Sequence, residues 1–171
     1  YQESLVRNFS DGTYSQARLF PTSSSYASVK KQYKDNIVYS PQDATTFFYA
    51  FNYNRKAYNF TAKTTDAQKN SATAAMLNKD FRQAINFAFN RKAYGAQQNG
   101  EDGATKILRN SLVPPTFVQI GEKSFGSAVE GNLASYGDEW KDVKLDDAQD
   151  GLYNADKAKA EFAKAKEALQ A

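Results

Sequence analysis

The chain has 171 residues, which is enough for a domain with its own hydrophobic core. Its 22 basic and 19 acidic side chains nearly balance, so the charge indicates no nucleic-acid partner and no anionic membrane partner. Cysteine and histidine are absent, which excludes disulfides, thiolate or imidazole metal sites, and catalysis by a nucleophile that relies on a histidine base.

The first elements predicted along the chain are short helices. Residues 2–10 carry apolar side chains at helical spacing, and the Asp-Gly pair at 11–12 marks a turn. Residues 22–28 are rich in serine and predict a loop, and a short basic helix is expected over about 26–34.

Residues 45–52, with the sequence TTFFYAFN, carry the strongest strand prediction. They are mostly β-branched and aromatic. Because the run is apolar on both faces, we expect this strand to be covered on both sides. The period of two then places Phe47, Tyr49 and Phe51 on one face, and Thr46, Phe48, Ala50 and Asn52 on the other.

A surface excursion is predicted for the polar residues 54–72, with a helical piece around 71–77. An amphipathic helix follows from Asp80 to about Gln98, because apolar residues recur there at the spacing of a buried helix face. Asp80 is the predicted N-cap, with Gln83 as its partner in a capping box.

The last third of the chain predicts less regular structure. A short helix is expected over 103–110, and the two prolines at 114–115 require an extended chain before them. Residues 121–151 are rich in Gly, Ser and Asp, with Trp140 as an isolated anchor. A final helix is predicted over 155–169, with a buried stripe and an i,i+4 ion pair between neighbouring turns: Ala158, Phe162, Ala165 and Leu169 for the stripe, Lys157 and Glu161 for the pair.

Few residues could carry chemistry. Asp146 and Asp150 match two positions of a calcium-binding loop, but Lys157 falls where a bidentate glutamate is needed, so a solvated acidic turn is the better interpretation. Basic and aromatic residues alternate over 53–58, which could stack single-stranded nucleic acid, but a solvated loop fits the balanced charge better. No glycine-rich phosphate-binding pattern occurs, and we expect no cofactor.

The string DFRQAINFAFNR at 80–91 resembles the first long helix in the second lobe of oligopeptide-binding proteins, the solute-binding family 5 receptors of ABC importers. Further pieces follow in the family's order: the strand before this helix at 46–52, a proline turn at 111–115 and a helix start at 153–159. The Thr- and Lys-rich insert before Asp80 looks most like the Gram-positive lipoprotein members.

The resemblance implies a fold and a function. The fold would be α/β, part of the second lobe of a type II periplasmic-binding-protein-like, two-lobed clamp, with a mixed sheet flanked by helices. Residues 1–171 would form a single domain, a fragment of the C-terminal lobe. The implied function is the capture of oligopeptides for import and not catalysis. The implied partners are oligopeptides, the ABC permease subunits and the remaining lobe, at the extracellular face of the cell membrane with a lipid anchor.

The resemblance also implies a site. In the family the strand before the signature helix lines the cleft, so its cleft-facing side here would be Thr46, Phe48, Ala50 and Asn52. The signature helix would be structural, with Arg82 and Arg91 tying it to its neighbours.

Two other functions stay open on the sequence. A carbohydrate-binding or surface-adhesion module would present its tyrosines and phenylalanines as a planar strip on the surface. A carboxylate-dependent hydrolase would need two acidic side chains about 5–10 Å apart in one pocket.

Overall fold

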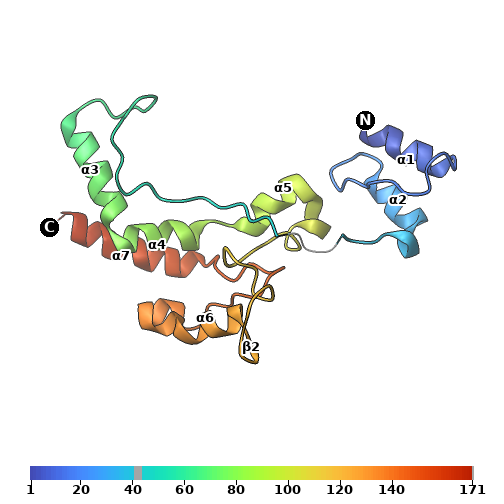
Figure 1. Ribbon diagram of the computed structural model, residues 1–171. Helices are drawn as coiled ribbons and strands as arrows, with labels where there is room; N and C mark the ends of the chain where they lie inside the picture. The colour runs from blue at the N-terminus through green and yellow to red at the C-terminus, as the bar shows by residue number, and fades with distance from the viewer. Residues whose placement is uncertain (41–43, 171) are drawn as a thin grey trace.

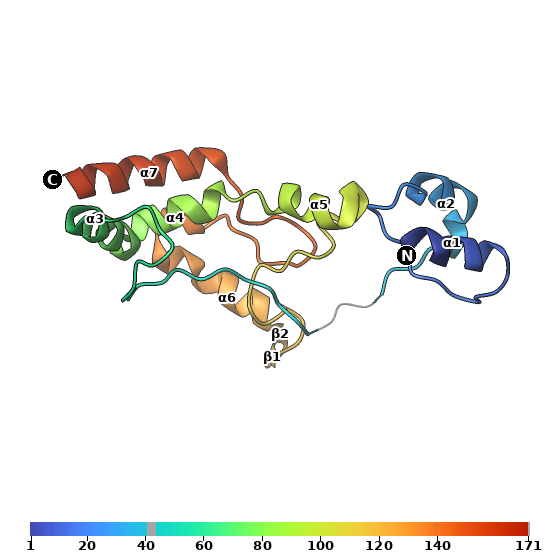
Figure 2. The ribbon, with the colours of Figure 1, turned by 90° about the horizontal axis from the view of Figure 1, so that it is seen from above.

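A computed structural model describes residues 1–40 and 44–170 of the chain. The molecule is elongated, with α1 (Gln2–Ser10) and α2 (Tyr26–Gln32) at one end and the C-terminal helix α7 (Ala155–Gln170) at the other (Figures 1 and 2). The predictions of these three helices are confirmed within two residues at each end.

The N-terminal helices connect to the rest of the molecule through α5 (Arg91–Gly103). A short 3-10 helix, η1 (Lys34–Asn36), follows α2. The Tyr26 hydroxyl donates to Asp102 over 2.8 Å, and Lys30 pairs with the same carboxylate. Burial and this hydrogen bond raise the pKa of Tyr26 to about 12, so the link keeps its proton at every physiological pH.

The polar segment before the signature helix contains more helix than predicted. α3 (Asp66–Leu77) begins at Asp66 rather than near residue 71. A capping box explains the early start: the Thr65 hydroxyl accepts from the backbone N–H of Gln68 over 3.3 Å, and the Gln68 side chain accepts from the N–H of Thr65 over 3.1 Å.

The prediction of one continuous helix from Asp80 to Gln98 is wrong. The chain forms α4 (Lys79–Ala88) and then α5, separated by two residues with non-helical torsion angles. Asn90 interrupts the helix because its side chain accepts from the N–H of Ala93 over 2.9 Å and so begins a new helix. The predicted cap is also wrong, because Asn78, not Asp80, accepts from the N–H of Phe81 over 2.8 Å.

Replacing Asn90 with alanine should lower the unfolding free energy of the chain by about 1 kcal/mol, because α5 loses its N-cap. Chemical denaturation would measure the change. Asn90→Asp is the matched control, since aspartate caps helices as well as asparagine does. Equal stability of the alanine and aspartate variants would contradict the assignment of this cap.

The prediction that residues 45–52 form a strand buried on both faces is wrong for the described structure. The segment is extended, drawn in teal in Figure 1, but it pairs with no other strand among residues 1–40 and 44–170. Phe47 and Phe48 are 94% and 69% exposed. The sequence has the propensity of a strand, but a strand also needs a neighbour to satisfy its backbone.

In the part of the chain that the structure describes, the sheet consists of β1 (Gln119–Ile120) and β2 (Lys123–Ser124). The two strands run antiparallel, with Gln119 opposite Ser124. The α/β class is therefore confirmed in its coarse form, whereas the expected mixed sheet is absent from the described residues.

The region 121–151 is more regular than its composition predicts. It contains α6 (Phe125–Leu133) and two 3-10 turns, η2 (Ala134–Tyr136) and η3 (Asp138–Trp140). α6 was not predicted from the sequence because it contains two glycines, which are poor helix formers. The helix predicted over 103–110 is also wrong, since this stretch is mainly turn after α5 ends.

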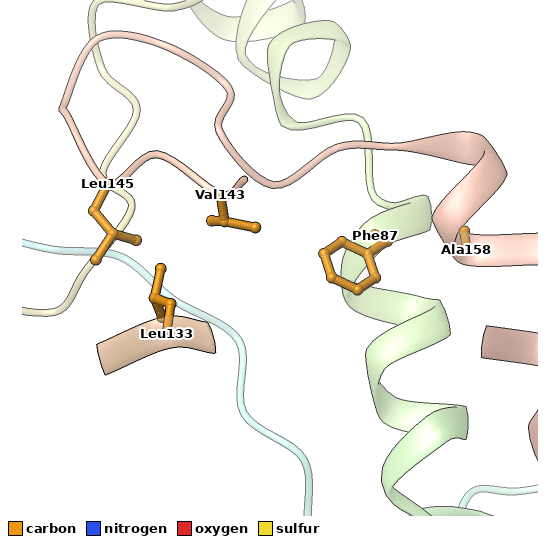
Figure 3. Packing of buried hydrophobic residues seen from close by; sticks show 5 residues of the cluster. All are labelled: Phe87, Leu133, Val143, Leu145 and Ala158. Atoms are coloured by element: carbon orange, nitrogen blue, oxygen red, sulfur yellow. The ribbon is translucent and has the colours of Figure 1, made fainter. Parts of the chain in front are cut away.

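The hydrophobic core lies where α4, α6 and α7 meet the loop after η3. Phe87 of α4 is completely buried and faces a cluster contributed by these elements (Figure 3): Leu133, Val143, Leu145 and Ala158. The Trp140 ring packs against Phe87 with centroids 5.1 Å apart, as expected of an anchor. Among the described residues, no helix is both long and apolar enough to cross a membrane.

α7 packs along α4, but its buried face differs in part from the predicted stripe (Figure 2). Ala158 and Ala165 are buried as expected, whereas Phe162 and Leu169 stay largely exposed. Glu161 is buried instead, and it pairs with Lys164 over 2.7 Å rather than with Lys157 as predicted. Glu161 can be buried on this face because Gln83 of α4 donates a hydrogen bond to it.

Candidate functional site

The predicted ligand-binding residues lie on the extended segment before α3. Phe48, Ala50 and Asn52 are exposed, and Thr46 is half-buried. The Thr46 hydroxyl donates to the carbonyl of Leu112 over 3.0 Å, and the Asn52 side chain accepts from the N–H of Asn54 over 3.0 Å. The four residues thus lie along one extended stretch of chain, residues 46–52, which we call the strip.

Of the aromatic residues between them, Tyr49 contacts α4. The Tyr49 hydroxyl donates to the side chain of Asn86 over 3.1 Å, and the ring of Tyr49 packs edge-on against Phe89 at 5.6 Å. Phe51 also packs against Tyr49. The predicted alternation is therefore met in part: Tyr49 reaches α4, but Phe47, which was expected on the same face, is 94% exposed.

A depression of about 810 Å³ opens between α3 and the loop that precedes it. Of the predicted site residues, Asn52 lines this depression. A second depression of about 720 Å³ adjoins it, because both are lined by Arg55, Tyr58 and Lys63. The prediction of a solvated loop over 53–58 did not include these depressions, although the alternation of basic and aromatic residues there was a signal for them.

A network of polar side chains joins α4, η3 and α7. The amide nitrogen of Gln83 donates to Glu139 over 2.9 Å and to Glu161 over 2.7 Å. Its amide oxygen accepts from the indole N–H of Trp140 over 2.8 Å. Glu161 is only 2% exposed, so Gln83 and Lys164 supply the hydrogen bonds and the charge that its burial requires.

Glu139 is held ionised by its surroundings. A hydrogen bond from its own backbone N–H outweighs partial burial and, with the bond from Gln83, lowers the pKa of the Glu139 carboxyl. Lys79 lies 3.9 Å away. Two acidic side chains therefore do converge on Gln83, but both are satisfied by packing partners and neither lines the two depressions. The contacts of Gln83 with both carboxylates therefore stabilise the packing of α4 against η3 and α7.

A second network forms at the start of α5. Asp150 accepts from the Arg91 guanidinium over 2.7 Å and also from the backbone N–H of Arg91 over 3.1 Å. Arg91 also donates to the carbonyl of Arg109 and to the side chain of Asn110. The prediction that Arg91 ties the signature helix to its neighbours is confirmed.

Asp150 therefore has a structural partner. Burial opposes its ionisation, but the hydrogen bonds from Arg91 and from the backbone of Tyr153 prevail and lower the pKa of Asp150. Among the described residues, no group of three or more acidic side chains is placed to hold a metal ion. Arg82 likewise serves packing, since it donates to the carbonyl of Met76 and lies 4.8 Å from the ring centre of Tyr53.

The sequence of the chain is similar to those of several known proteins. No model of a protein family matches the chain. The chain is 62% identical over 165 residues to the oligopeptide-binding protein SarA of Streptococcus gordonii, which covers 96% of this chain and 25% of SarA. It is 60% identical over 166 residues to AliA of Streptococcus pneumoniae, covering 97% of this chain and 25% of AliA.

The oligopeptide-binding protein AliB of Streptococcus pneumoniae is 56% identical over 170 residues, which is 99% of this chain and 26% of AliB. The chain thus spans about a quarter of the length of the curated relatives it matches. Its aromatic strip is exposed, as an adhesion module would require, but the relatives named above are oligopeptide-binding proteins and not carbohydrate-binding proteins.

Proposed function

We propose that this chain is a segment of an oligopeptide-binding receptor and takes part in capturing oligopeptides for an ABC importer. Nearly the whole chain aligns with about a quarter of the length of each relative named above. The observation that carries the proposal is identity of 56–62% across 96–99% of the chain. The segment belongs to the second lobe of a two-lobed clamp, as a single domain fragment over 1–171. It binds and does not catalyse.

The receptor acts at the extracellular face of the cell membrane, where a lipid anchor holds it near the permease subunits. Oligopeptides enter the cleft between the lobes and are held largely by hydrogen bonds to their backbones, so that one site tolerates many side-chain sequences. Closure of the lobes over the peptide then signals to the permease.

The extended segment supports this role. Phe48 is 69% exposed and Ala50 is also exposed, so both side chains are accessible to a ligand. No described residue pairs through its backbone with residues 46–52, which leaves N–H and C=O groups available to a neighbouring strand or to an extended peptide. The small side chain of Ala50 would leave room beside Phe48 for a side chain of the peptide.

Replacing Phe48 with alanine in the full-length receptor should weaken peptide binding about tenfold, because an exposed aromatic side chain at the centre of the strip loses its contact with the ligand. Isothermal calorimetry with a defined peptide pool measures the affinity, and circular dichroism should show unchanged helix content.

Phe60→Ala serves as the matched control. Phe60 is fully exposed and lies on the loop before α3, outside the strip. Equal affinities of the Phe48 and Phe60 variants would remove the strip from the binding site, and absence of peptide binding by the unmodified receptor would overturn the proposed function itself.

A further inference from the structure

The two depressions beside α3 form one groove. Arg55, Tyr58, Lys63 and Thr73 line both of them, so the depressions meet along these side chains. Each has a volume in the range of small-molecule and peptide side-chain sites, about 720 and 810 Å³. The groove begins at Asn52, where the proposed peptide-binding strip ends.

One end of the groove is apolar. α3 contributes several small side chains and Met76, and α4 contributes Phe81. The lining alanines leave room between the helix and the loop: Ala62, Ala67, Ala72 and Ala75. This end can therefore accept an aliphatic or aromatic side chain and remove it from water.

The other end of the groove is basic. Arg55, Lys56, Lys63 and Lys69 line it, against the single carboxylate of Asp66. Asp66 lies 3.6 Å from Lys69 and so offsets that cation. The remaining excess of positive charge faces the groove.

Arg55 is held in place at the boundary of the two ends. Its guanidinium stacks on Tyr58, 4.7 Å from the ring centre, and its Nε donates to the carbonyl of Ala57 over 2.7 Å. The Tyr58 hydroxyl is anchored in turn by the carbonyl of Lys69 at 3.1 Å and the hydroxyl of Thr73 at 2.9 Å. The terminal nitrogens of Arg55 are therefore presented in a fixed direction, which suits a carboxylate.

We propose that this groove, which we call the α3 groove, binds the carboxylate-bearing end of a captured peptide, with the carboxylate at Arg55 and Lys63 and a neighbouring apolar side chain against Met76 and Phe81. The inference rests on the proposed function, since the peptide must already lie along the strip that ends at Asn52. Charge complementarity and continuity with that strip select a peptide as the occupant.

The carboxylate can come from the peptide's C-terminus or from an Asp or Glu side chain, and matched peptides distinguish these sources. Calorimetry on the full-length receptor would use peptides of one length that carry Glu or Gln beside an apolar residue, each with a free or an amidated C-terminus. We expect the peptides with a carboxylate to bind about tenfold more tightly than the peptide that lacks one, and the preference to shrink as salt is added.

The double variant Arg55→Gln/Lys63→Gln should abolish this preference while binding the uncharged peptide within about twofold of the unmodified receptor. The control Lys31→Gln/Lys166→Gln removes the same charge from exposed positions on α2 and α7 and should keep the preference. The single variant Lys63→Gln changes an exposed residue and leaves the stacking of Arg55 on Tyr58 intact, so it should reduce the preference less than the double variant does.

Survival of the preference in the double variant, or no preference in the unmodified receptor, would overturn the α3 groove as a carboxylate site while leaving peptide capture standing. If the unmodified receptor bound none of the peptides, the proposed function itself would be overturned. Retention on phosphatidylglycerol vesicles through Arg55 and Lys63, without any peptide preference, would reassign the groove to membrane docking.

Discussion

Replacing Phe87 with alanine is expected to lower the unfolding free energy of the chain by about 4 kcal/mol. Among the described residues, Phe87 is the largest apolar side chain with no exposure. Its ring lies among the buried side chains shown in Figure 3 and also packs against Trp140, with centroids 5.1 Å apart. Lys157 also lies over this ring, 5.7 Å from its centre. Truncation would leave a cavity that three separate elements line, so the surroundings cannot collapse easily.

Denaturant titration followed by tryptophan fluorescence measures this effect directly, because Trp140 is the only tryptophan and touches Phe87. The control is Phe47→Ala in the same chain, which removes a ring that is 94% exposed and should change stability by less than about 0.5 kcal/mol. Similar losses in the two variants would show that Phe87 is not the centre of the core.

Replacing Asp150 with asparagine should lower the unfolding free energy by about 3 kcal/mol, because the guanidinium of Arg91 would remain poorly solvated without its counter-charge. The Arg91 and Asp150 side chains are only 15% and 11% exposed, so water would compensate little. Asp156→Asn is the control: this carboxylate is 97% exposed, 3.8 Å from Lys159, and should contribute less than about 0.5 kcal/mol.

The pH dependence of the same pair has a definite sign. The folded state lowers the pKa of Asp150, so the ionised carboxylate contributes its full stability above the unfolded pKa of about 3.9. As pH falls below about 4 toward the lower folded pKa, the difference in stability between the unmodified chain and Asp150→Asn should shrink. A difference that stays constant down to pH 2 would contradict the assignment.

Local signals in the sequence were sufficient for the terminal helices. α1 and α7 have apolar residues at helical spacing, and α7 is also rich in helix-favouring Ala, Lys and Glu; the structure confirms the bounds of both within one residue. No contact with a distant segment is needed to predict such elements.

The break between α4 and α5 could not be predicted in the same way. Asn90 has the potential to cap a helix, but the new helix start is also fixed by Asp150, which accepts from the backbone N–H groups of Arg91 and Lys92. These residues lie far apart in the sequence. Spacing within the helix carries no information about such a partner.

Buried polar residues escaped prediction for the same reason. Gln83 and Glu161 would each be placed on a solvated face by hydropathy alone, and they meet across 78 positions of sequence. Their burial depends on their mutual hydrogen bond of 2.7 Å, on the indole of Trp140 and on the ion pair of Glu161 with Lys164. The sequence located Trp140 as an anchor but not the polar side chain that it holds.

For the candidate site, the sequence located the extended strip, but neither its complete alternation nor the way in which the strip is covered. Propensity and period of two are local properties of residues 45–52, whereas the layers that would cover Phe47 and Phe48 must come from other segments. The α3 groove was missed because it is formed jointly by a loop and a helix that only tertiary packing brings together.

The exposed run TTFFYAF at 45–51 has a practical consequence when the chain is produced alone. It carries no charge and no proline, favours β-structure, and leaves the rings of Phe47 and Phe48 94% and 69% exposed. Those are the properties of segments that stack between molecules into aggregates. Aggregation of the isolated chain should therefore increase with its concentration and reduce the yield of soluble protein. A single lysine substituted into this run should oppose aggregation by placing a charge in the segment.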